Sequence, residues 1–191
     1  MNTIAHMVIA SAVLAKRDHP TRNWVVVAGS FVPDASMFVF FAWSRLQGWS
    51  GDETWNVQYW MEPWQTLGAI SNSFILFGLL CALAWWRKWL FLGALSAAAL
   101  IHLGLDFPLH ANDSHRHFWP LSDWRFFSPV SYWDPAYNGW LGGLIESIIT
   151  LGAIAVLWAR FNAGRWRIAF ALLALVQVLF LAAQITWWLN N

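Results

Sequence analysis

Charge and cysteine are both scarce in this chain of 191 residues. Only 11% of the residues are charged, and Cys81 is the single cysteine. A lone cysteine excludes an internal disulfide, and because Cys81 lies within an apolar run, we expect it to serve packing. The net charge is +1, and there is no basic run and no glycine-rich phosphate loop, so the sequence predicts no nucleic-acid partner. Internal repeats and linkers are also lacking, which favours a single domain over residues 1–191.

Apolar residues, in contrast, make up 59% of the chain. They gather in runs near the roughly 20 residues that a helix needs to cross a bilayer. The runs are Asn23–Trp43, Thr66–Trp86, Trp89–Leu105, Gly139–Ala159 and Trp166–Leu189, preceded by the shorter Thr3–Ala15. We therefore predict an all-α integral membrane bundle of about six helices, of which the first is too short to span untilted. Lys16 and Arg17 follow the first run instead of preceding it, which argues against a signal peptide.

The positions of the basic residues predict which way the bundle faces. Eight of the 11 fall in alternate connections between the apolar runs, namely Lys16, Arg17, Arg22, Arg87, Lys88, Arg160, Arg165 and Arg167. Because basic connections stay in the cytoplasm, both termini and the other connections are expected on the non-cytoplasmic side. One of those other connections, Gln47–Gln65, carries acids among several Trp residues. We expect it to form a short amphipathic helix at the outer interface.

The stretch Ile101–Asp134 breaks the apolar pattern, because it holds four of the six His and four of the ten acids. His102 and Asp106 stand four residues apart at the end of an apolar helix, so their side chains lie on one face and can share a metal ion. His6 and Asp34 come from other apolar runs, where an ionisable group costs about 3 kcal/mol or more without a partner. Two His and two carboxylates suit zinc, manganese or iron. We predict one or two divalent ions here, zinc first; the alternative is an interfacial pair that reaches toward lipid headgroups.

The loop after Asp106 carries further candidates. They are His110, Asp113, His115, Arg116, His117 and Arg125. Spacing in a loop does not identify ligands, and an ordinary polar loop explains these residues equally well. On the functional interpretation, His110 is a further metal ligand, Asp113 or Glu146 accepts a proton, and His115 or His117 protonates the leaving group. Arg116 and Arg125 bind phosphate in this interpretation, although contact with headgroups is an equally good account of both.

The order of these motifs resembles that of a known family. His6 is followed by Val32-Pro33-Asp34, by His102-x-x-x-Asp106 and by the turn Pro120–Ser122. This order is similar to that of the bacterial inner-membrane family of membrane-bound metal-dependent hydrolases, which is distantly similar to zinc-dependent phospholipase C. The resemblance implies His6, Asp34, His102 and Asp106 as metal ligands and a phosphoester or similar bond as the target.

The chain departs from that family at one motif. The family carries a His-Arg and Thr-His-Ser motif at the opening of a helix, where this chain has Ser71-Asn72-Ser73. His110, His115 and His117 are the candidates for the missing ligands.

Together, these observations predict a membrane-embedded metal-dependent hydrolase that acts on a phosphoester or lipid-linked substrate from the non-cytoplasmic side. Two alternatives stay open. One is a non-enzymatic subunit or assembly factor of a larger membrane complex, with the Trp-rich faces as contacts. The other is a carrier of a small polar ligand or cofactor, whose path the same polar cluster would line. Membrane lipid is an expected partner in all three cases.

Overall fold

The apolar runs of the sequence all fold as helices. The computed structural model describes residues 1–190, and in them it contains seven α-helices and no strand. The α-helices are α1 (Thr3–Leu14), α2 (Pro20–Gln47), α3 (Glu62–Ser71), α4 (Phe74–Arg87), α5 (Leu90–Asp106), α6 (Gly139–Arg160) and α7 (Gly164–Asn190). Five helical stretches in the described residues are long and apolar enough to cross a membrane, with α3 and α4 together forming one of them. The prediction of an all-α membrane bundle is confirmed.

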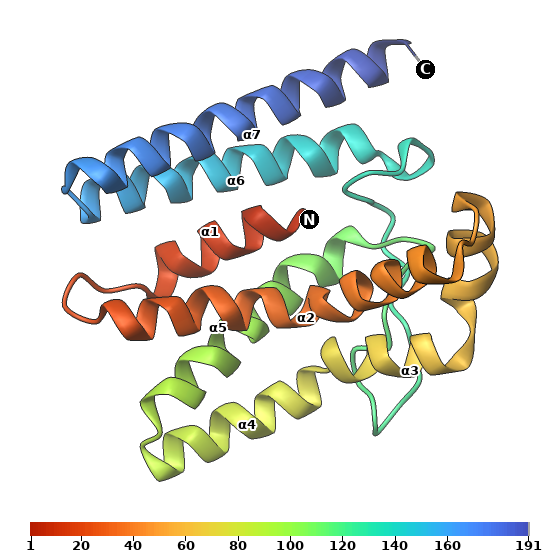
Figure 1. The fold of residues 1–191 in the computed structure, drawn as a ribbon, viewed down its shortest axis with the longest axis horizontal. Coiled ribbons are helices and arrows are strands. Elements are labelled where there is room, and N and C mark those ends of the chain that lie inside the picture. Colours follow the sequence, from red (N-terminus) through yellow and green to blue (C-terminus); the bar gives the residue numbers. More distant parts are fainter. Residues whose placement is uncertain (191) are drawn as a thin grey trace.

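The helices run side by side, and their connections alternate between two ends of the bundle (Figure 1). The short α1–α2, α4–α5 and α6–α7 connections meet at one end, which carries the eight basic residues named above. Arg160 joins two of these connections through its hydrogen bond to the Ala15 carbonyl at 2.7 Å. The opposite end holds the longer connections, including residues 107–138. The chain therefore has a basic end and, opposite to it, an end where the His and Asp residues collect.

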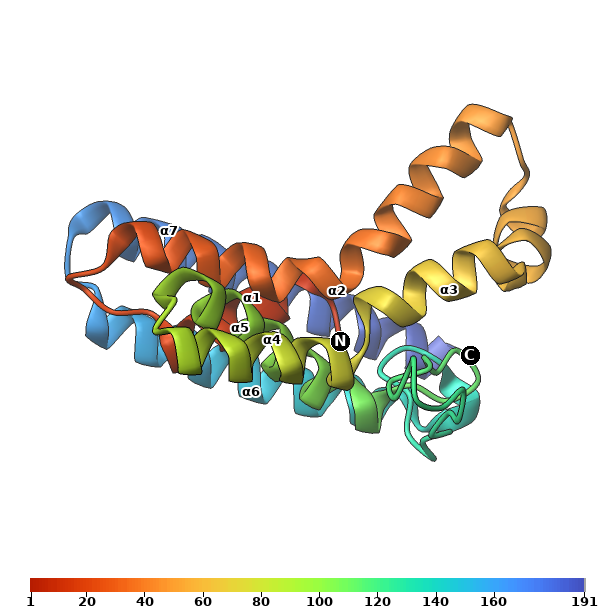
Figure 2. The same cartoon turned by 90° about the horizontal axis from the view of Figure 1, so that it is seen from below.

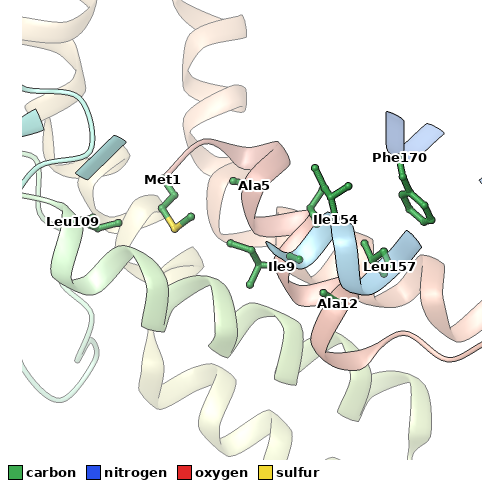
Figure 3. Packing of buried hydrophobic residues seen from close by; sticks show 10 residues of the cluster. Met1, Ala5, Ile9, Ala12, Leu109, Ile154, Leu157 and Phe170 are labelled. Carbon is green, nitrogen blue, oxygen red and sulfur yellow. The ribbon is translucent and has the colours of Figure 1, made fainter. Parts of the chain in front are cut away.

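Helix α1 lies inside the bundle and stops partway along it. Its 12 residues extend about 18 Å at 1.5 Å per residue, too short to cross a bilayer of about 30 Å. Ala5 and Ile9 of α1 are buried, and they belong to one apolar cluster with Ile154 and Leu157 of α6 and Phe170 of α7 (Figure 3).

Helix α2 bends near its middle, as Figure 2 shows, and its C-terminal half leans away from α5. Pro33 lies inside the helix at this point. Because proline has no backbone N–H, the Gly29 carbonyl lacks its usual helical donor, and the pyrrolidine ring displaces the preceding turn. The bend separates the half of α2 that packs on α5 from the half that rises toward α3.

Two predicted elements differ from the structure. The expected single helix Thr66–Trp86 is broken between α3 and α4, where Ser73 caps α4 by accepting a hydrogen bond from Leu76 N at 3.0 Å. At this break, the chain pairs with the loop that follows α5, because Phe74 N donates a hydrogen bond to the His117 carbonyl at 2.8 Å. The expected short helix within Gln47–Gln65 is present over residues 51–60, but it passes from α-helical into π-helical geometry at Glu53–Val57 and into 3-10 geometry at Gln58–Trp60. The 3-10 turns Phe107–Leu109 and Pro135–Tyr137 complete the structure.

The outer surface of the bundle is apolar. Along α7, Leu172, Leu175 and Leu179 are 58%, 53% and 59% exposed. Exposed apolar surface costs about 25 cal/mol per Å² in water, but nothing comparable in lipid. At the basic end, the Arg87 guanidinium lies 4.8 Å from the centre of the Trp86 ring, a pairing typical of the membrane interface. These surfaces fit contact with membrane lipid.

Candidate metal centre

The position of His102 depends on a close approach between α2 and α5. At Gly29 of α2, an added Cβ atom would lie 2.3 Å from the Leu95 carbonyl oxygen of α5. About two turns later in α5 than that contact, His102 reaches across the interface, and its Nδ1–H donates to the Ser30 carbonyl at 2.6 Å. A carbonyl can only accept, so this bond places the hydrogen of a neutral His102 on Nδ1 and leaves Nε2 with a free lone pair. The backbone of α2 thereby prepares His102 as a ligand.

His6 and His102 converge on one carboxylate. Their rings stack with centroids 3.5 Å apart and planes 12° apart. His6 Nε2 lies 2.9 Å from Asp106 Oδ1, and His102 Nε2 lies 3.2 Å from Asp106 Oδ2. All three residues are buried, and their ligand atoms lie within 4.8 Å of one another. The three therefore present two imidazole nitrogens and a carboxylate to one point.

Asp34 completes the set on the side of α2. Its Oδ1 lies 3.5 Å from His102 Nε2, while Thr3 Oγ1 donates to its Oδ2 at 2.5 Å. Four ligands about 2.1 Å from a zinc ion in a tetrahedron are about 3.4 Å apart, close to this separation. The Met1 amino group also lies here, 2.5 Å from Asp106 Oδ1. An ion at this point would compete with that amine for Asp106.

The residues present fit a divalent ion. Among the described residues, His102 Nε2, His6 Nδ1 and His110 Nε2 are buried ring nitrogens that make no hydrogen bond. Buried nitrogens are normally paired, because burial without a partner costs about 1–3 kcal/mol. Two imidazoles and two carboxylates form a donor set that zinc, manganese and iron accept. The Ser30 and Thr3 contacts are outer partners of the kind that orient metal ligands.

His110 stands beside this group as half of an Asp–His pair. Its Nε2 lies 3.4 Å from Asp106 Oδ2, and its Nδ1 lies 3.0 Å from Asp113 Oδ2. Burial disfavours the charged imidazole, but Asp106 and Asp113 outweigh it and raise the pKa of His110 to about 9. Burial likewise opposes ionisation of Asp113, yet the hydrogen bonds from His110 and Trp133 lower its pKa to about 2. His115 differs, because burial, with His110 and His117 nearby, lowers its pKa to about 3.

A cavity of about 720 Å³ opens onto the candidate ligands. Asp34 and Asp106 lie in its wall, together with His110, Asp113 and His115. The rest of the wall is mostly aromatic or apolar and comes from α2, from the turns after it, from α3 and from α7. Met1 and Asn2, which precede α1, and Thr3 at its start also border this space.

Neither predicted phosphate-binding arginine lines the cavity. Arg116 pairs with Glu62 at 3.1 Å and Asp123 at 3.2 Å, and Arg125 donates to the Ser114 carbonyl at 3.0 Å. Arg125 also reaches α3 through Gln65 Oε1 at 2.9 Å. Both guanidinium groups therefore fasten the loop 110–134, onto itself and onto α3. Phosphate binding by either residue stays a prediction.

Two other candidates are occupied away from the cavity. Glu146 of α6 is fully buried and accepts hydrogen bonds from the backbone and side-chain nitrogens of Asn2. Asn2 in turn caps α1 by accepting from Ala5 N at 2.9 Å. His117 Nδ1 donates to the Asn72 carbonyl at 2.9 Å, within the break between α3 and α4. These contacts give Glu146 and His117 structural partners, and their predicted proton-transfer roles stay untested.

Sequence reasoning missed the residues that hold the ligands. Ser30 acts through its carbonyl, which no side-chain pattern reveals, and Gly29 acts by having no side chain. A weak signal existed in the spacing, since Gly29 and Ser30 precede Pro33-Asp34 in an otherwise apolar helix. Thr3 and Asn2 gave no such signal.

Comparisons with known proteins add no assignment. No protein-family model matches this chain, and neither does any curated protein or solved structure. The resemblance to membrane-bound metal-dependent hydrolases therefore stays a prediction, and function has to be argued from the site.

Proposed function

We propose that this protein is a membrane-embedded, metal-dependent hydrolase whose substrate is a phosphoester or lipid-linked molecule. One observation carries the proposal: two buried imidazole nitrogens without hydrogen-bond partners, His102 Nε2 and His110 Nε2, lie 3.2 and 3.4 Å from Asp106 Oδ2, and Asp106 lines a large cavity. A purely structural cluster has no need of access from a cavity, whereas a catalytic site requires it.

The proposed ligands are His6, Asp34, His102 and Asp106. A divalent ion supplies Lewis acidity and yields a nucleophile from water at neutral pH. The chain's own residues do the rest. Ser30 and Thr3 fix the orientation of the ligands, so that donor atoms from α1, α2 and α5 meet at one point.

The Asp113–His110 pair is the proposed proton-handling group. Asp113 holds His110 Nδ1, and this directs Nε2 toward Asp106 and the cavity. An imidazole so oriented by a carboxylate can exchange a proton with a group in the cavity. The apolar walls keep bulk water away from that exchange. His115, with its lowered pKa, is the neutral imidazole of the same wall.

We further propose that the cavity faces the non-cytoplasmic side of a bacterial inner membrane. The grouping of eight of the 11 basic residues at the opposite end supports this orientation. Leu121, which is 77% exposed in the loop 110–134, offers a direct test. A cysteine introduced there is expected to react with a membrane-impermeant reagent in intact spheroplasts. Labelling only after lysis would indicate the opposite orientation, with the cavity facing the cytoplasm.

Metal analysis of the purified protein tests the central proposal. The native protein is expected to hold one or two equivalents of a divalent ion and to cleave a phosphodiester such as bis(p-nitrophenyl) phosphate. The double variant His102→Ala, Asp106→Ala should lose both properties. His19→Ala is the matched control, because His19 is exposed and lies at the basic end. Full metal retention in the double variant removes the proposed mechanism, and so does a native protein that binds no divalent ion.

A further inference from the structure

The cavity wall includes apolar side chains as well as the His and Asp residues described above. Met37 of α2 and Phe180 of α7 both line the cavity, and they are 38% and 37% exposed. Each belongs to a helix long and apolar enough to cross a membrane. These two residues are therefore the candidates for a lateral entrance to the cavity.

Aromatic side chains form much of the cavity wall. Its rings are Phe40, Trp55, Tyr59, Trp60, Trp64 and Trp133. Phe40 is the centre of this group, with its ring centroid 5.0 Å from that of Trp64 and 5.6 Å from those of Trp55 and Tyr59. Such a wall accepts an acyl chain or a cation, since ring faces are both apolar and partially negative.

The cavity wall carries more carboxylates than cationic groups. Four aspartates line it, Asp34, Asp106, Asp113 and Asp134, and no lysine or arginine does so in the described part of the chain. The Met1 amine is already paired with Asp106, and His110 with Asp113. Asp134 accepts a hydrogen bond from Ala136 N at 2.9 Å and has no cationic partner among the described residues. An ammonium group in the cavity would meet the unpaired Asp134 carboxylate and ring faces, whereas a headgroup without a cation would leave Asp134 unpaired.

The acids are not the only sign of a ligand. His110 Nε2 is buried, lacks a hydrogen-bond partner and belongs to a residue of the cavity wall. A polar atom left in this state beside a large cavity is normally completed by what the cavity binds.

We propose that the cavity takes a bilayer lipid from the side, between α2 and α7, and selects a headgroup that carries an ammonium group. The acyl chain lies against Met37, Phe40 and Phe180, while the ammonium lies near Asp134 and the Trp133 ring. The proposal deepens the proposed function by naming its substrate class. It concerns binding, and so can be tested without turnover.

Native mass spectrometry of the detergent-purified protein provides the test. The probe is an equimolar mixture of phosphatidylethanolamine and phosphatidylglycerol with identical acyl chains. We expect one phosphatidylethanolamine to be retained in about 30-fold preference, the size of one desolvated cation–π contact. Equal retention of the two lipids, or preference for phosphatidylglycerol, overturns the proposal. The measurement is repeated after chelation, where the preference should persist. If the protein prefers phosphatidylethanolamine but hydrolyses no phosphodiester, the lipid-binding inference holds and the proposed hydrolase activity fails.

Matched variants locate the two parts of the lipid. Asp134→Asn keeps an oxygen for Ala136 N but removes the charge, and should bring the lipid preference close to parity. Asp18→Asn, exposed at the basic end, should leave it unchanged. Phe180→Trp narrows the opening and should reduce retention of both lipids, unlike Leu175→Trp, which lies on α7 away from the cavity. Wild-type preference in Asp134→Asn refutes the headgroup assignment, and equal retention in the two tryptophan variants refutes access from the side.

Discussion

Replacing Gly29 by alanine should disturb the candidate metal centre without touching any ligand. The new Cβ would stand 2.3 Å from the Leu95 carbonyl oxygen and 2.8 Å from Leu95 Cα. Ordinary contacts of this kind are about 3.4 Å or longer, so α2 and α5 must separate by about 1 Å. The obstacle is backbone, which cannot rotate out of the way as a side chain can. Overpacking of this kind costs typically 1–3 kcal/mol, and we expect about 3 kcal/mol here.

The same separation would reach His102. Its Nδ1–H bond to the Ser30 carbonyl is 2.6 Å long, and an increase of about 1 Å exceeds hydrogen-bond length. His102 would then lose the contact that fixes its tautomer and ring orientation. Loss of such an outer partner typically lowers metal affinity about 10–100-fold. Gly29→Ala should therefore weaken both the fold and the affinity for a divalent ion, even though Gly29 coordinates nothing.

Two measurements check this expectation. Unfolding in mixed micelles gives the change in stability, and competition with a chromophoric chelator gives the affinity for zinc. Gly104→Ala is the matched control, because Gly104 lies in α5 and an added Cβ there meets nothing within 4 Å. It should be neutral or gain up to about 1 kcal/mol from the higher helix propensity of alanine. If Gly29→Ala unfolds and binds zinc as the native protein does, the close α2–α5 contact does not control the site. If it is destabilised but keeps native affinity, the link through Ser30 is wrong.

Three further predictions concern the surroundings of the site. Glu146→Ala should destabilise the protein by about 1–3 kcal/mol, since it leaves buried donors at the start of α1 unpaired, and Glu146→Gln should be milder in the same unfolding assay. The pKa of His110 is raised from 6.5 to about 9, so the stability it contributes is complete below pH 6.5 and is lost as the pH rises through 9. The loss should be on the order of 3 kcal/mol in chelator-treated protein and clearly smaller in Asp113→Asn, and a flat stability profile from pH 6.5 to 9.5 would contradict the pairing. Arg116→Ala should change stability by about 1 kcal/mol or less but speed amide exchange in residues 116–125, because its partners Glu62 and Asp123 are exposed. Lost phosphodiesterase activity with unchanged exchange would instead favour the phosphate-binding role.

The predicted helices and the observed ones agree closely at most ends. The run Trp89–Leu105 became α5, Leu90–Asp106, and Gly139–Ala159 became α6, Gly139–Arg160. Long apolar runs determine helices because backbone groups in lipid must satisfy one another within the segment. The same reasoning was wrong at Asn72, where hydropathy predicted continuity. There the helix ends because backbone groups of Asn72 and Phe74 form hydrogen bonds with His117 of the loop. Hydropathy cannot predict a helix end that depends on such a contact.

The pairing of His102 with Asp106 was open to sequence reasoning because four residues are one helical turn. Their convergence with His6 and Asp34 was expected only because the residues were predicted to lie at similar depth in the membrane. Depth along a helix does not say which way a side chain points, and Glu146 illustrates this. At comparable depth in an apolar helix, it turned toward Asn2 instead of the cavity.

By itself, the sequence determined a helical membrane bundle, the basic end of that bundle and the crowding of His and Asp residues at the other end. These follow from composition and from periodicity along one chain. Only the tertiary structure decided that His6 stacks on His102, that a carbonyl of α2 orients His102, and that Asp34 and Asp106 line one cavity. The reason is that these contacts join residues about 70 to 100 positions apart. They depend on how closely two helices approach, which local spacing does not specify.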